Sequence, residues 1–312
     1  MFNNFVTLQR FIIFVFLAAA VPNLWASDAD TEWLSVKQGY FTIYYHYEDF
    51  NNTRYILNTI AEHIPLLTGN TGLQINRGCE IYLSSKPAEF GELTGWRLPP
   101  WTQGVAIPQK RIIILKSPRF SGSKFDLGRA AVHEFVHILV YSEAGNIPLW
   151  LNEGLAVLLS GEGYFNSQEL SHAVLMKKVV SFDEMEDVLR FESMKANLTY
   201  QQALSATQYL VKEFGWEAVQ KIFSNMKQGE SFQEAFFHST GLWLDEFEAE
   251  WAKELHSQYR WAFLKDLDYL IFLLFGPIVL IGGFLMWRRR RRIIKQWEIE
   301  DRYYDSEDYT EY

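Results

Sequence analysis

Two histidines four residues apart constrain this chain most strongly, because they stand in the middle of an apolar segment. The run His133-Glu134-Phe135-Val136-His137 is flanked by alanine, valine, isoleucine and leucine residues on both sides. This pattern predicts a helix over Phe125–Tyr141, on which the two imidazoles share one face. Burying two imidazoles and a carboxylate in such a helix is costly unless a partner satisfies them. A metal ion is the partner that this spacing favours.

The next apolar segment supplies a candidate for a third ligand. Glu153 lies in the run PLWLNEGLA, and the loop before it is short enough to turn one helix back beside the other. We therefore expect His133, His137 and Glu153 to hold one Zn²⁺ ion, with the fourth position left to water. Glu134 follows the first ligand directly, so it can reach that water without being a ligand, and we predict it to be the general base.

The motifs HEFVH and PLWLNEGLA together resemble the gluzincin metallopeptidases. The resemblance is greatest to the peptidase MA-like group, which is distantly related to the M1 aminopeptidases and to thermolysin-like peptidases. It covers residues 104–251 and implies a zincin-like catalytic domain with Glu153 as the third zinc ligand and Glu134 as the general base. It also implies that Tyr200, in the segment YQQA, donates a hydrogen bond to the oxyanion of the transition state. A plain packing role for Tyr200 is the alternative.

Two departures from these relatives affect the expected activity. In the related aminopeptidases a strand before the zinc helix carries a glutamate that holds the free amine of the substrate. The corresponding strand here, Gly104–Pro108, contains no acid, and this favours an endopeptidase. Val157 also stands where thermolysin-like relatives have an aspartate, so another group must orient the histidines.

The order of patterns along the chain predicts an α+β fold. We expect a small N-terminal lobe with a mixed sheet and an edge strand over 27–118, and a helical zinc-peptidase lobe over 119–265. The predicted strands are 40–45, 79–83, 104–107 and 111–115. The predicted helices are 52–67, 125–141, 148–159, 200–214, 216–226 and 244–259, with a break at Gly215 and a capping box from Ser231 to Glu234.

Two further apolar segments predict a membrane location. Residues 1–26 have the features of a signal peptide, with an uncleaved signal anchor as the alternative. Tyr269–Trp287 carries no charge and would reach about 28 Å as a helix, which predicts one C-terminal transmembrane helix in the lipid bilayer. Arg288–Arg292 follow at once, so the tail over 288–312 is expected in the cytoplasm. The N-terminal domain would then be extracytoplasmic, either periplasmic or extracellular.

Composition narrows the class of function. The chain has 312 residues and a net charge of −9, which argues against binding to nucleic acid. Its only cysteine is Cys79, so the chain can form no internal disulfide and no cysteine-based metal site. We expect a membrane-anchored zinc metallopeptidase that acts on a peptide or protein substrate. The alternative is a non-catalytic zinc-binding module that acts in envelope protein binding or assembly. The oligomeric state stays open.

Overall fold

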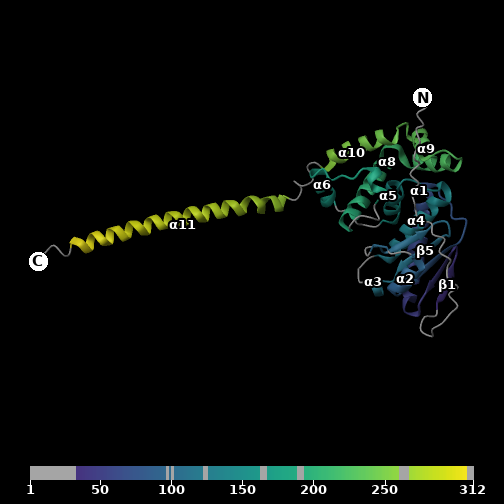
Figure 1. Ribbon diagram of the computed structural model, residues 1–312, viewed down its shortest axis with the longest axis horizontal. Coiled ribbons are helices and arrows are strands. Elements are labelled where there is room, and N and C mark those ends of the chain that lie inside the picture. Colours follow the sequence, from purple (N-terminus) through teal and green to yellow (C-terminus); the bar gives the residue numbers. More distant parts are fainter. Residues whose placement is uncertain are drawn as a thin grey trace, which may run out of the picture. The chain divides into compact units, whose positions relative to one another are not determined.

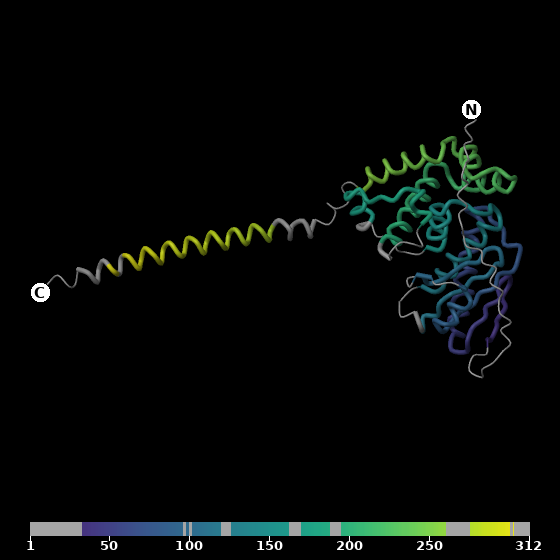
Figure 2. The backbone as a smooth tube through the Cα atoms, in the orientation of Figure 1, coloured from purple at the N-terminus to yellow at the C-terminus, as the bar shows by residue number. Residues whose placement is uncertain are grey.

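The computed structural model describes residues 33–95, 98–99, 102–121, 126–161, 167–187, 193–259 and 267–307 (Figure 2). The predicted signal peptide over 1–26 and the last five residues of the chain lie outside this range. The described chain divides into two compact units. The first comprises residues 1–165 and 180–251, and the second comprises residues 166–179 and 252–312.

The first unit contains a five-stranded mixed sheet in the order β1-β2-β3-β5-β4. Its strands are β1 (Leu34–Gln38), β2 (Phe41–Tyr45), β3 (Cys79–Ser84), β4 (Gly104–Ile107) and β5 (Ile112–Lys116). The three central strands β2, β3 and β5 run parallel, and β1 and β4 are antiparallel to their neighbours. Strand β4 is therefore the last described strand at one edge, as expected for the lobe with an edge strand.

Alternate residues of the central strands face two different layers. Ile43, Ile81, Ile113 and Leu115 are fully buried on the face that α1 (Phe50–Thr71) and α4 (Leu127–Ala144) cover. The rings of Phe41 and Phe135 meet there at a centroid distance of 4.9 Å. The other face packs against α2 (Pro87–Thr94), where Phe90 lies with Val105 and Ile114. Helix α4 is thus a core helix with the sheet on one side.

The other side of α4 packs against further helices. It contacts α5 (Leu149–Ser160) and α8 (Ser193–Lys227). The unit also contains η1 (Tyr47–Asp49), α3 (Pro118–Ser121), α7 (Phe182–Met185), α9 (Phe232–Thr240) and α10 (Leu244–Tyr259) as far as Trp251. Figure 1 shows α4 between the sheet and the helical layer. Helix α8 is interrupted at Gly215, whose φ of 74° lies outside the helical region. The predicted capping box at Ser231 and Glu234 is present at the start of α9.

The second unit contains α6 (Ser167–Leu175), the end of α10 (Leu244–Tyr259) and α11 (Leu267–Glu307). The segment Tyr269–Trp287, for which the sequence predicts a transmembrane helix, forms part of α11. Within the described residues, no helix combines the length and the apolar character needed to cross a membrane. The side chains of residues 260–274 are not among those described.

Candidate metal centre

Helix α4 places His133 and His137 one turn apart in the centre of the first unit. The helix begins after Asp126, whose side chain accepts a hydrogen bond from the backbone N–H of Arg129. Val132, Phe135 and Val136, which adjoin the two histidines in α4, are fully buried. The imidazoles of His133 and His137 lie with ring centroids 4.9 Å apart and planes at 79°. Both rings therefore leave the same face of α4, as their spacing predicts.

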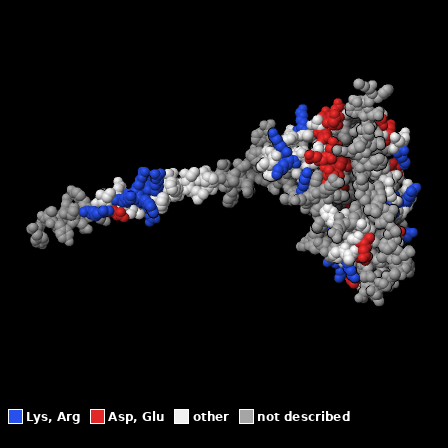
Figure 3. Space-filling view, in the orientation of Figure 1, with Lys and Arg blue, Asp and Glu red and all other residues white. Residues whose placement is uncertain are grey.

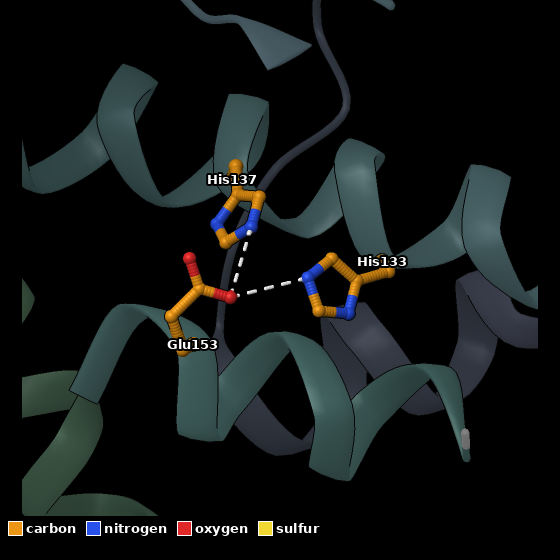
Figure 4. A group of neighbouring side chains, drawn as sticks. All are labelled: His133, His137 and Glu153. Carbon is orange, nitrogen blue, oxygen red and sulfur yellow. Dashed lines mark ion pairs between the residues drawn. The ribbon is translucent and has the colours of Figure 1, made fainter. Parts of the chain in front are cut away.

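Glu153 comes from α5 and meets both histidines (Figure 4). Its Oε2 atom lies 3.3 Å from Nε2 of His133 and 3.7 Å from Nε2 of His137. The three side chains are only 11–13% exposed. In the part of the chain that the structure describes, they form the only group of three or more potential ligands that could share one ion.

These distances fit a tetrahedral metal ion. Ligand bonds of about 2.0–2.2 Å place neighbouring ligand atoms of a tetrahedron roughly 3.3–3.6 Å apart. The two Nε2–Oε2 distances are close to that range, and two nitrogens with one carboxylate oxygen are a donor set that Zn²⁺ accepts. His133, His137 and Glu153 are therefore suited to hold the predicted ion with little rearrangement.

The charge state of Glu153 follows from two opposing effects. Burial acts to raise the pKa of its carboxyl, and the neighbouring His137 and His133 act to lower it. The histidines outweigh burial, so the pKa of Glu153 lies below its ordinary value. The carboxylate is thus ionised at neutral pH, which is the form that binds a metal.

Asn152 orients one of the histidines. Its side-chain Oδ1 lies 3.0 Å from Nδ1 of His137. An amide oxygen can only accept, so Nδ1 of His137 carries a hydrogen, and Nε2 is the nitrogen left to bind a metal ion. The valine at position 157, where related enzymes have an aspartate, predicts that another group orients the histidines, and Asn152 fills that role for His137. The position of Asn152, directly before the predicted ligand Glu153, is the sequence feature that could have identified it as the orienting group.

Glu134 lies against the edge strand β4. A Cβ atom at Gly104 would come within 3.0 Å of Cγ and Oε1 of Glu134, and within 2.7 Å of Cδ2 of Leu115. The absence of a side chain at Gly104 therefore lets the Glu134 carboxylate approach the backbone of β4. The sequence predicts both the strand and the glutamate, but it does not predict this contact.

Comparison with known proteins agrees with this geometry. The family model described as Peptidase MA superfamily matches residues 59–257, which is more than half of the chain. The chain belongs to the Peptidase MA superfamily. This membership supports a peptidase-like function, and members of the superfamily are typically metal-dependent. No curated protein matches the chain in a sequence comparison.

The superfamily match also covers Tyr200, which lies in α8 and is partly buried. Helix α8 packs closely on α5, because a Cβ at Gly154 would overlap Oγ1 of Thr207 and the carbonyl of Ala203. Tyr200 lies three residues before Ala203 and seven before Thr207, so it shares the face of α8 that meets α5. The tyrosine is therefore on the side of α8 nearest the helix of Glu153, and its catalytic role stays a prediction.

Proposed function

We propose that this member of the Peptidase MA superfamily is a zinc metallopeptidase of the gluzincin type that hydrolyses internal peptide bonds. The observation that carries the proposal is the convergence of His133, His137 and Glu153 within 4.8 Å, beside a glutamate that lies against an edge strand. Helices α4 and α5 supply these groups and strand β4 lies against Glu134, so no single local motif accounts for the arrangement.

The metal ligands and the ion have separate tasks. The Nε2 atoms of His133 and His137 and a carboxylate oxygen of Glu153 would hold Zn²⁺. When bound, the ion would polarise the scissile carbonyl and lower the pKa of a nearby water molecule. Asn152 keeps His137 in the tautomer that binds metal.

Glu134 moves the proton. Its carboxylate accepts a proton from the attacking water, while the water oxygen bonds to the carbonyl carbon. Glu134 then delivers the proton to the amide nitrogen as the C–N bond breaks. The hydroxyl of Tyr200 would donate to the oxyanion that forms, and such a donor is typically worth about 3 kcal/mol. Glu134 comes from α4 and Tyr200 from α8, and both of these helices pack on α5, which carries Glu153.

The edge strand β4 supports an extended, internal substrate segment. Within the described sheet, β4 pairs only with β5, so its second edge can accept a peptide in the manner of an added strand. Gly104 would bring that peptide next to Glu134. Its successors Val105, Ala106 and Ile107 offer no carboxylate to bind a free amine. An endopeptidase fits this lining better than an aminopeptidase.

The experiment is a comparison of the parent with Glu134→Gln. The full chain, purified in detergent and loaded with Zn²⁺, is incubated with an unfolded protein and with amino-terminal reporter amides. We expect internal cleavage by the parent, and a loss of at least about 100-fold for the variant, as for removal of a general base. Equal activity of the two proteins would refute the proposed role of Glu134. Cleavage of the reporter amides alone would refute the endopeptidase assignment.

Zinc binding without any cleavage would favour the second candidate, a non-catalytic module that binds envelope proteins. The presence of Glu134 next to the ligands favours the enzyme, because a binding module needs no proton acceptor at this position. The same comparison therefore separates the two functions.

We also propose that the protein is held at the cell membrane with its N-terminal domain outside the cytoplasm. The support is the order of side chains on α11: the large apolar residues from Phe275 to Trp287 are exposed, and the exposed Arg288–Arg292 follow them directly. Figure 3 shows these arginines as a blue cluster beside an uncharged stretch. Labelling of intact cells with a reagent that cannot cross the membrane tests the topology. Labelling of the 288–312 tail, and not of the N-terminal domain, would refute it.

A further inference from the structure

The first turn of α5 is held by a carboxylate from another element. Oε1 of Glu186 accepts a hydrogen bond from the backbone N–H of Leu149, with an N···O distance of 2.8 Å. Leu149 is the first residue of α5, and Pro148 before it makes no side-chain cap. Glu186 therefore supplies the acceptor that this helix N-terminus lacks locally.

Glu186 is itself fixed by the short helix α7, which it ends as the C-cap residue. The ring of Phe182 in α7 stacks on Trp150 of α5 at a centroid distance of 4.5 Å and an angle of 9°. The backbone N–H of Phe182 donates to Oε1 of Glu248 in α10 at 2.9 Å. Both rings are buried. Helix α7 thus has little freedom to move, and Glu186 is held firmly above the first turn of α5.

This turn determines where a metal ligand lies. Leu149 and Glu153 are four residues apart, so they are joined by one α-helical hydrogen bond and stand one above the other. We propose that Glu186 is a positioning residue for the metal centre. By fixing the first peptide of α5, it keeps Glu153 against the two metal-binding histidines. This inference rests on the proposed function, because it assumes that Glu153 is a ligand.

The charge of Glu186 makes simple capping a poor explanation. Burial raises the pKa of its carboxyl, and nearby Asp183 and Asp187 raise it further, while the bond from Leu149 lowers it. An ionised carboxylate is therefore costly here. A serine or asparagine at position 148 would cap α5 without that cost. A role in holding α5 against α7 therefore explains the buried carboxylate of Glu186 better than helix capping alone.

The test measures Zn²⁺ affinity of the full chain by competition with a chelator, alongside thermal unfolding of the metal-free protein. Glu186→Ala should weaken zinc binding by about 10-fold, as is usual for loss of a group that orients a ligand. Glu186→Gln keeps an oxygen acceptor and should stay within about threefold of the parent. Zinc binding by Glu186→Ala as tight as that of the parent would overturn the inference.

Glu234→Ala is the matched control. It removes the same kind of bond, in which a carboxylate accepts from a backbone N–H at the start of a helix, but at α9, where it has no part in holding α7. We expect it to lower the unfolding temperature about as much as Glu186→Ala while zinc affinity changes by less than about threefold. Equal loss of zinc affinity in the two variants would show a general effect of stability and would overturn the inference.

Glu186→Asp decides the matter if the alanine variant does not fold. It keeps the charge but is one methylene shorter, so its carboxylate falls short of Leu149. It should weaken zinc binding about as much as alanine, by roughly 10-fold, while Glu186→Gln does not. Equal affinities of the Asp and Gln variants would overturn the inference. A parent chain that holds no zinc would overturn the proposed function as well, which separates the two failures.

Discussion

Asn152 Oδ1 lies 3.0 Å from His137 Nδ1, and this contact joins α5 to α4 directly beside Glu153. Asn152 thus orients the predicted ligand His137, and the next residue in the chain, Glu153, is itself a predicted ligand. The tautomer of His137 therefore depends on α5, the helix that carries the third ligand.

Removing this contact should weaken the metal site. Asn152→Ala leaves Nδ1 of His137 without its acceptor, and we expect a loss of about 10- to 100-fold in zinc affinity. Asn152→Asp keeps an acceptor at the same position and should retain most of the affinity. Chelator competition on both variants measures the difference. An alanine variant that binds zinc like the parent would show that Asn152 does not orient the ligand.

A methyl group at Gly104 should harm catalysis more than metal binding. Gly104→Ala places its Cβ within 3.0 Å of Glu134 and within 2.7 Å of Leu115, so one of these side chains must move. We expect kcat/KM to fall by at least about 10-fold, since a small displacement of a catalytic group has effects of this size or larger. Zinc content should not change.

Gly91→Ala is the control for that substitution, because a Cβ at Gly91 meets nothing within 4 Å. Its activity should equal that of the parent. If Gly104→Ala also retained full activity, the contact between Glu134 and β4 would have no catalytic significance.

The packing of α5 on α8 should be the most sensitive to added volume. Gly154→Ala would drive a methyl group into Thr207 and the backbone of Ala203, and backbone atoms cannot yield as a side chain can. We expect a loss of roughly 1–3 kcal/mol or more in the free energy of unfolding. Urea unfolding of the metal-free chain, again beside Gly91→Ala, measures it. Unchanged stability would mean that the two helices are further apart than described.

Asp126 should make the stability of α4 depend on acid. Burial tends to raise the pKa of Asp126, but hydrogen bonds from Arg129 and Tyr55 outweigh burial and lower it below 3.8. A carboxyl whose pKa falls on folding stabilises the fold above its unfolded pKa, and the contribution is lost as the pH falls through the folded value.

The matching experiment is urea unfolding of Asp126→Ala and the parent at pH 7 and near pH 2. The free energy of unfolding of the variant should be about 1 kcal/mol lower than that of the parent at pH 7, as for loss of a helix N-cap. This difference between the two proteins should become smaller in acid. The residue is partly exposed, so solvent screening limits the effect. A gap that widens in acid would contradict the sign of the pKa change.

The elements with strong local signals were predicted well. The sequence predicts β4 over 104–107, and the structure places it there. The break at Gly215 and the capping box at Ser231 are also present. Each of these depends on neighbouring residues alone: a β-branched run, a residue that tolerates positive φ, or a serine three residues before a glutamate.

Elements that depend on distant contacts were missed. The sequence pattern does not predict α7, whose four residues are too few to show helical periodicity. It forms where Phe182 stacks on Trp150 and bonds to Glu248, residues that lie 32 and 66 positions away. Strand β1 was missed because its residues are mostly exposed and their apolar alternation is weak.

The same distinction holds for the candidate site. His133 and His137 share a face because of helical spacing, and the sequence is enough to predict this. That Glu153 meets them depends on how α5 packs on α4; the sequence predicts it only indirectly, from an acid in a second apolar segment after a short loop and from the resemblance to a family. The contacts of Asn152, Gly104 and Glu186 arise from tertiary packing, and local patterns do not reveal them.

The metal content of the purified full chain tests the central claim most directly. The chain is loaded with Zn²⁺, dialysed, and analysed for zinc per molecule beside Glu153→Gln, which retains the shape of the side chain but not its charge. The account predicts one zinc ion per parent chain, held by the single group of three ligands, and far less zinc in the variant. A parent chain without stoichiometric zinc, or a variant that holds as much as the parent, would contradict it.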